Sequence, residues 1–277
     1  MTPSRLAINQ ITTKSWSLEQ AIVGYARAGV HGIGVWRDKL QQCGIGRARS
    51  LLRDAQAWVP SLCKAGDLAA MRAHGASAAL DDCRRACDEA AEIGAPTVVF
   101  VCGGIGGASS LADARTQVAE LLLQAAEYAA KAGVTLGIEP FHPMHAAERG
   151  CINTLRQAHA LRQQVGPSAK VVFDVFHCWW DPDVMTYTAA PYTQETATVQ
   201  LCDWRVPTRH PVTDRAMVGD GVADIAAMVR QFEANGYTGP YEIEIFSEDW
   251  WAVDPAQVVA TCIDRYRQVT ASAALAH

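Results

Sequence analysis

Four polar side chains stand at the ends of short apolar segments in the second half of the chain. Three are carboxylates and one is an amide, and a charged group that ends a buried segment is costly unless a cation meets it. Oxygen-dominated ligation with open positions suits Mn²⁺ or Mg²⁺, and Co²⁺ or Zn²⁺ are also compatible. The candidate metal ligands are Glu139, Asp174, Gln200 and Glu244.

Each of these residues also has a structural interpretation. Asp174 ends the apolar run Val171-Val172-Phe173 and could simply cap the turn that follows. Glu242 and Glu244 would lie on the same face of one strand, because side chains alternate along a strand. We favour Glu244 as the ligand because it is nearer the following loop. Glu242 would lie one layer deeper, where a basic group could pair with it.

Two further residues near these segments are candidates for binding a substrate. His177 follows Asp174 by three residues and could donate to a substrate oxygen, or it could pack beside Trp179. Arg205 could bind a hydroxyl, carboxylate or phosphate with paired hydrogen bonds. The alternative is that Arg205 forms an ion pair with Asp203 or Asp220.

Two aromatic side chains complete the set of candidate substrate-binding residues. His142 lies in the loop after Glu139, with His145 close behind, and we expect at least one of them to face the pocket. Trp36 lies at the end of an apolar segment, where an aromatic face commonly stacks on a sugar, although tryptophans are also found in cores. The glycine-rich run 103–107 lacks the spacing of a phosphate-binding loop and is expected to border the pocket.

The elements that must position these residues alternate between strand and helix along the whole chain. Eight such units, with strands that are apolar on both faces, favour a closed (β/α)₈ TIM barrel over an open sheet. We expect one domain that spans residues 1–277. The predicted strands are 5–9, 32–36, 58–63, 97–102, 134–139, 170–175, 198–202 and 239–246. The predicted helices are 17–28, 46–56, 68–73, 80–93, 111–132, 152–165, 224–234 and 255–271.

This fold explains how separated residues could form one site. Reactive groups in such barrels lie where strands end and the following loops begin. Glu139, Asp174, Gln200 and Glu244 stand at the ends of the last four predicted strands. They are therefore expected to converge at the mouth of the barrel.

Composition excludes several classes of protein. The net charge of −5 and the lack of a long basic run argue against a nucleic-acid partner. No apolar stretch is long enough to span a membrane, and a cytoplasmic location is expected. The nine cysteines are scattered without a CxxC pair, so a structural zinc site is not expected.

The motifs around the candidate ligands resemble those of the sugar phosphate isomerase/epimerase family, the xylose isomerase-like TIM barrels. The resemblance covers about residues 5–267. It implies that the four candidate ligands hold one divalent metal ion and that His177 and Arg205 contact substrate oxygens. Ketose 3-epimerases have His where Gln200 stands, and hydroxypyruvate isomerase-like members have Gln. The motifs are Ile138-Glu139-Pro140, Phe173-Asp174-x-x-His177, Val199-Gln200-Leu201-Cys202-Asp203 with Gly219-Asp220-Gly221 downstream, and Ile243-Glu244-Ile245-Phe246.

The resemblance implies an isomerase or epimerase that acts on a sugar or a small hydroxy-ketone. The metal ion would stabilise an enediolate while Glu139 and Glu244 remove and return a proton. Loss of a β-hydroxyl from the same intermediate would make the protein a lyase, either an inosose-type dehydratase or an enzyme that cleaves oxidised glycosides. A non-catalytic carbohydrate-binding barrel is the alternative from another class. The expected partner is a small carbohydrate, and a homo-oligomer is possible.

Overall fold

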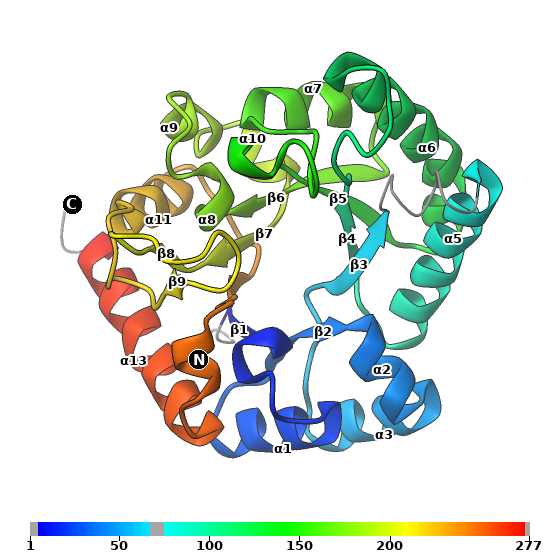
Figure 1. Ribbon diagram of the computed structural model, residues 1–277. Helices are drawn as coiled ribbons and strands as arrows, with labels where there is room; N and C mark the ends of the chain where they lie inside the picture. The colour runs from blue at the N-terminus through cyan, green and yellow to red at the C-terminus, as the bar shows by residue number, and fades with distance from the viewer. Residues whose placement is uncertain (1–4, 67–74, 275–277) are drawn as a thin grey trace.

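Eight parallel strands close into a barrel in the order β1-β10-β7-β6-β5-β4-β3-β2. The protein was analysed as a computed structural model that describes residues 5–66 and 75–274. Figure 1 looks along the barrel, with the strands at the centre and the helices around them. The predicted fold class is confirmed. The barrel strands are β1 (Leu6–Asn9), β2 (Gly32–Trp36), β3 (Leu62–Gly66), β4 (Thr97–Val101), β5 (Thr135–Glu139), β6 (Ala169–Asp174), β7 (Thr196–Leu201) and β10 (Tyr241–Ile243).

The helices cover the outer face of the barrel with apolar stripes. Helix α1 begins as predicted at Ser17, whose hydroxyl accepts from the backbone N–H of Gln20 in a capping box. The longer helices are α1 (Leu18–Arg27), α2 (Arg37–Cys43), α3 (Ile45–Asp54), α5 (Ala76–Glu92), α6 (Leu111–Lys131), α7 (Leu155–Val165), α11 (Ile225–Ala234) and α13 (Pro255–Ala274). Shorter ones are η1 (Gln10–Thr13), η2 (Pro143–His145), α8 (Val175–Cys178), α9 (Val184–Tyr187), α10 (Tyr192–Glu195) and α12 (Glu248–Trp251).

The third strand differs most from its prediction. We expected it at 58–63, whereas β3 runs from Leu62 to Gly66. Pro60 lacks the N–H that a central strand donates to its neighbour, and Trp58 keeps only an isolated bridge to Gly32. Helix α5 begins earlier than the predicted residue 80, at Ala76. The helix predicted at 68–73 lies outside the described residues.

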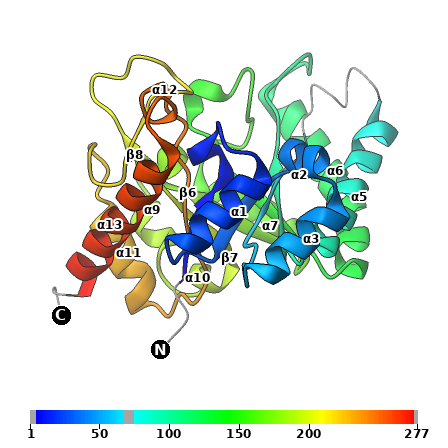
Figure 2. The ribbon, with the colours of Figure 1, turned by 90° about the horizontal axis from the view of Figure 1, so that it is seen from below.

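A small antiparallel hairpin was not predicted. It pairs β8 (Asp203–Trp204) with β9 (Arg215–Ala216). The Asp203 carboxylate holds the returning chain, because it accepts from the backbone N–H groups of Gly219, Gly221 and Ala223 at 2.9 to 3.1 Å. In side view, the yellow loop after β8 and helix α12 lie at the same end of the barrel (Figure 2). The hairpin therefore returns Arg215 to the mouth of the barrel.

A polar layer inside the barrel lies below this mouth. The Glu242 carboxylate accepts hydrogen bonds from Asn9 Nδ2 at 2.7 Å, Ser61 Oγ at 2.9 Å and Thr198 Oγ1 at 3.4 Å. These donors are neutral, so the expected basic partner of Glu242 is not found among them. A Cβ at Gly34 would lie 1.8 Å from Glu242 Oε1, which explains the glycine there. Burial raises the pKa of Glu242 to about 7.

Among the described residues, no helix combines the length and the apolar character that crossing a membrane requires.

The buried Glu242 predicts a loss of stability as the pH rises. Its carboxyl loses its proton near the ordinary value of 4.5 in the unfolded chain but near 7 in the fold. The unfolded state therefore binds fewer protons between these values, and folding stability falls as the pH rises through that window. Between pH 5 and pH 8, the wild type should lose roughly 3 kcal/mol more of its unfolding free energy than Glu242→Gln does.

Urea unfolding in EDTA measures the unfolding free energies of the wild type and the variant, and the exposed Glu120→Gln is the control. Parallel pH profiles for the wild type and Glu242→Gln would contradict this prediction.

Candidate active site at the barrel mouth

A cavity of about 360 Å³ opens at the end of the barrel where the strands finish. Its apolar wall includes the rings of Trp36, Phe141 and Phe246. The remaining wall carries an unusual density of charge for a cavity of this size. The charged residues that line it are Lys64, Glu139, Glu148, Arg149, Arg215 and Glu244.

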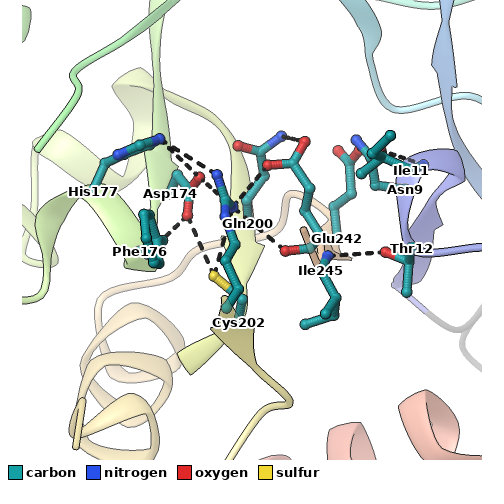
Figure 3. Close-up of polar contacts among 12 residues, drawn as sticks. Asn9, Ile11, Thr12, Asp174, Phe176, His177, Gln200, Cys202, Glu242 and Ile245 are labelled. Carbon is teal, nitrogen blue, oxygen red and sulfur yellow. Dashed lines mark hydrogen bonds and ion pairs between the residues drawn. The ribbon is translucent and has the colours of Figure 1, made fainter. Parts of the chain in front are cut away.

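The four predicted metal ligands come together at the base of this region. Asp174 and Gln200 are direct partners between β6 and β7, and the N–H of Glu244 donates to Leu201 O at 3.0 Å. Each side chain is nearly inaccessible to solvent, with exposed fractions of 5% for Glu139, 0% for Asp174 and Gln200, and 4% for Glu244. Figure 3 shows the polar ends of Asp174, His177 and Gln200 directed toward one region. The convergence follows from parallel strands whose ends meet at one rim.

Arg215 supplies the positive charge at the centre of this group. Its Nη1 donates to Asp174 Oδ2 at 2.9 Å and to Glu244 Oε2 at 3.0 Å. The guanidinium lies between two aromatic rings, 4.5 Å from the centroid of Phe176 and 4.8 Å from that of Phe246. Because it is only 5% exposed and bound on several sides, Arg215 is a fixed part of the site.

Burial dominates the electrostatics of the carboxylates. It raises the pKa of Glu139 well above its ordinary value, and the negative charges of Glu244 and Asp174 raise it further. Burial raises the pKa of Glu244 to about 8, against the lowering effect of Arg215. The pKa of Asp174 is also raised by burial. Arg215 and, at Glu139, Arg149 lower these pKa values but do not offset burial, and the site favours either protons or a further cation.

His177 lies between two nitrogen donors and a carboxylate. Its Nδ1 accepts from the backbone N–H of His142 at 3.1 Å, and burial lowers its pKa well below the ordinary range. Its Nε2 lies 3.4 Å from Arg215 Nη2, which can only donate, and 3.7 Å from Asp174 Oδ2. A neutral imidazole has one acceptor nitrogen, so these contacts are compatible with Nε2 either as a donor or as a metal ligand at the centre of the site.

The residues present are chemically suited to a divalent metal ion. Potential ligand atoms of Glu139, Asp174 and His177 lie within 4.8 Å of one another. Gln200 Nε2 donates to Glu244 Oε1 at 3.3 Å, while the buried Gln200 Oε1 has no hydrogen-bond partner among the residues that the structure describes. A buried carbonyl oxygen without a donor, beside carboxylates with raised pKa values, is a favourable arrangement for a cation.

Trp36 lies where the sequence predicted it, in the wall of the cavity at the end of β2. Its indole N–H donates to Asn9 Oδ1 at 2.7 Å, and its ring meets the edge of Phe246 at 5.7 Å between centroids. Since Asn9 also donates to Glu242, the deeper polar layer orients this ring.

The other two predicted substrate-binding residues lie elsewhere. Arg205 forms ion pairs with Asp214 at 3.2 Å and Asp249 at 3.1 Å, and it borders a separate surface hollow. The His142 ring stacks on Trp204 with 4.8 Å between centroids, so this residue reaches the site through its backbone contact with His177. Neither side chain lines the cavity that holds Glu139 and Glu244.

Sequence reasoning did not select the two arginines that line the cavity. Arg215 precedes the Gly219-Asp220-Gly221 motif, and Arg149 follows Glu139 by ten residues in the same loop as His142. Proximity to a motif could have identified Arg215, but Arg205 lies equally near one of the motifs. Only the β8–β9 hairpin distinguishes Arg215 from Arg205.

Comparison with known proteins supports the fold. The protein SMc04130 from Sinorhizobium meliloti 1021 is 41% identical, with a TM-score of 0.91 over 95% of this chain and 98% of that one. The IolI protein with a bound zinc atom is 15% identical with a TM-score of 0.84, covering 95% and 97% of the two chains. L-ribulose 3-epimerase is 20% identical with a TM-score of 0.80, covering 98% and 95%. At these two identities the likeness shows the fold alone.

A curated relative is the 3-dehydroshikimate dehydratase of Pseudomonas putida, which is 26% identical over 259 residues. The match covers 89% of this chain but only 39% of that protein, so the chain spans well under half of the relative's length. The family model described as xylose isomerase-like TIM barrel matches residues 25–269. The closed parallel barrel, the acidic cluster at its mouth and this match together show that the chain belongs to the xylose isomerase-like TIM barrel family.

Proposed function

We propose that the protein is a divalent-metal-dependent enzyme that moves a proton on the carbon beside the carbonyl of a small polyhydroxylated ketone, and so isomerises or epimerises it. One observation carries this proposal. Glu139 and Glu244 are both buried, both have a raised pKa, and both line the same cavity. Two buried carboxyl groups with raised pKa values in one cavity are suited to accept and return a proton at carbon.

The proposed ligands of the metal ion are Glu139, Asp174, Gln200 and Glu244, with Mn²⁺ or Mg²⁺ favoured by the oxygen-rich set. The unpartnered Gln200 Oε1 and the excess of buried carboxylate charge support this assignment. The zinc atom in the IolI protein, which has the same fold, also supports it. When bound, such an ion would polarise the oxygens next to the reacting carbon and stabilise negative charge that develops there.

The chain's own residues have distinct proposed roles around this centre. Glu139 and Glu244 exchange the proton with the substrate carbon. In the tautomer that the hydrogen bond from the His142 N–H favours, the Nε2–H of His177 donates to a substrate oxygen. Arg215 holds the Glu244 carboxylate in one position and offsets its charge. Trp36 offers an aromatic face to the C–H surface of the substrate.

Dehydration is the second candidate outcome of the same proton removal. The 26% identity to the 3-dehydroshikimate dehydratase over most of this chain favours it. After one glutamate takes the proton, the other could protonate a departing β-hydroxyl group. The two outcomes differ in mass, because an isomer keeps the mass of the substrate and a dehydration product loses one water. Mass spectrometry of products from a panel of ketoses and inososes distinguishes them.

Replacement of either proton-transfer residue should abolish exchange at carbon. In Glu139→Gln and Glu244→Gln the amide keeps the shape of the side chain but cannot accept the proton. We expect deuterium uptake from D₂O into a substrate to fall by about 10²-fold or more in each variant, with an unchanged circular dichroism spectrum. Full exchange in either folded variant would remove that residue from the mechanism.

Loss of one ligand should weaken metal binding. In Asp174→Asn the substituted side chain has no negative charge, and we expect the affinity for Mn²⁺ to fall about tenfold or more. Elemental analysis of the purified wild type and titration of the metal-free proteins measure this. About one equivalent of metal in the wild type is expected. Equal affinity in Asp174→Asn would show that Asp174 is not a ligand.

The role of Arg215 as a counter-charge makes a separate prediction. Arg215→Gln leaves Asp174 and Glu244 without their cation, so the metal-free variant should lose about 3 kcal/mol of stability. Saturating Mn²⁺ should then raise the unfolding temperature of this variant more than that of the wild type, because the ion replaces the lost charge.

The matched control is Arg162→Gln, which breaks a partly shielded ion pair with Glu195, and neither of these residues lines the cavity. It should lose stability without any additional benefit from Mn²⁺. A metal-induced shift in Arg215→Gln that is no larger than the shifts in Arg162→Gln and the wild type would contradict the role of Arg215 as the counter-charge at the metal site.

A further inference from the structure

Arg149 is a cation in the cavity wall that forms no direct ion pair within residues 5–66 and 75–274. Its charge acts on Glu139 and Glu244 without an ion-pair contact, and it has an aromatic contact with Phe141, 5.8 Å from the guanidinium carbon to the ring centroid. Arg215 differs, because its charge is shared between Asp174 and Glu244. The cavity therefore contains one guanidinium group with direct ion pairs and one without them among the described residues.

The backbone holds Arg149 firmly at this place. Its N–H donates to His145 O at 2.9 Å, and the next residue, Gly150, forms a parallel bridge with Gly103 at the end of β4. The N–H of Cys151 donates to Gly103 O at 2.8 Å. A Cβ at Gly150 would lie 2.5 Å from the Cβ of Phe141, so this close approach requires glycine. The loop is thus built to present Arg149 to the cavity.

The position of Arg149 lacks a direct counter-ion among the described residues. Burial lowers its pKa and the positive charge of Arg215 lowers it further, whereas the negative charges of Glu139 and Glu244 raise it. An arginine remains charged, and no ion-pair contact with the described residues replaces the hydration that this guanidinium loses. Lys64 adds another positive charge to the wall, on an exposed residue. A neutral sugar or polyol would leave the Arg149 guanidinium without an ion-pair contact.

We propose that the substrate carries a carboxylate, which Arg149 binds with its paired N–H groups while the reacting carbon lies beside Glu139 and Glu244. This inference rests on the proposed function, because it identifies the class of substrate as a hydroxy-keto acid or an oxidised sugar. The planar fork of an arginine matches the two oxygens of a carboxylate. Lys64 contributes a second, longer-range attraction at the cavity wall.

A carboxylate fits this cavity better than a phosphate group does. Glu139 and Glu244 line the same cavity, and Glu148 adds a further acidic side chain to its wall. A phosphate monoester carries nearly two negative charges at neutral pH and would be repelled more strongly by these residues. The two positive charges of Arg149 and Lys64 equal in number the two negative charges of a substrate carboxylate and the exposed Glu148.

Binding of matched ligand pairs tests this proposal without requiring turnover. The pairs are D-glucuronate with D-glucose, D-galacturonate with D-galactose, and D-gluconate with D-sorbitol, each measured by calorimetry on the metal-free and Mn²⁺-loaded protein. We expect the acid of at least one pair to bind about tenfold more tightly than its neutral partner, as a paired charge-assisted contact would give. No preference for the acid in any pair would overturn the proposal, and so would tighter binding of D-glucose 6-phosphate than of D-glucuronate.

Two variants and one control assign the preference to Arg149. Arg149→Gln should reduce it to about threefold or less, and Arg149→Lys should give an intermediate value because it keeps the charge but loses the fork. Arg53→Gln, on exposed α3, should keep the full preference. Circular dichroism and Mn²⁺ titration show whether each variant is folded. A folded Arg149→Gln that keeps the preference, or an equal loss in Arg53→Gln, would overturn the assignment.

The outcomes also separate this inference from the proposed function. Acids that bind through Arg149 but exchange no deuterium under any metal condition would refute the proton-transfer mechanism and leave the anion site standing. Deuterium exchange into a neutral sugar, together with no preference for acids, would support the proton-transfer mechanism and refute the carboxylate site at Arg149.

Discussion

The cost of burying carboxylates in the barrel determines the organisation of the site. Glu139, Asp174 and Glu244 are almost completely removed from water, and each would be destabilised as an isolated charge. Arg215 reduces this cost by contacting two of them, and its own position is fixed by two phenylalanine rings. Burial, together with the neighbouring negative charges, raises the pKa values of Glu139 and Glu244 and favours a further cation. Stability, proton affinity and metal affinity are therefore coupled through one set of contacts.

Glu242 and Glu244, two glutamates at β10, lie in different environments. Glu242 lies in β10, Glu244 directly follows the last residue of that strand, and both are buried. Glu242 is surrounded by neutral donors from Asn9, Ser61 and Thr198, whereas Glu244 meets Arg215 and the cavity. The deeper layer supports the barrel and orients Trp36 through Asn9. The upper layer is available for chemistry because it borders open space.

The loops that follow the strands differ in role from the barrel itself. The barrel is shared with proteins that carry the names epimerase and dehydratase, at identities of 20% and 26%. Residues at the strand ends hold the charges that proton transfer needs. Arg149, Lys64 and the β8–β9 hairpin lie beyond or beside those ends, and they shape the part of the cavity that would contact the rest of a substrate. This separation is typical of TIM barrels, in which a stable frame supports variable loops.

The sequence by itself determined the barrel and the residues at its strand ends. Alternating apolar segments and capped helices report local structure, and parallel strands bring their ends to one rim, so the approach of Asp174, Gln200 and Glu244 followed from their positions alone. The third strand was misplaced because the apolar run around Val59 extended across Pro60. Which arginine enters the site was decided only by tertiary structure. Arg205 and Arg215 are separated by a short hairpin whose register depends on the distant backbone groups that Asp203 binds, and no local pattern encodes that register. The lack of an ion-pair partner for Arg149 among the described residues is likewise a property of the folded cavity, because it depends on which charges the fold brings into contact.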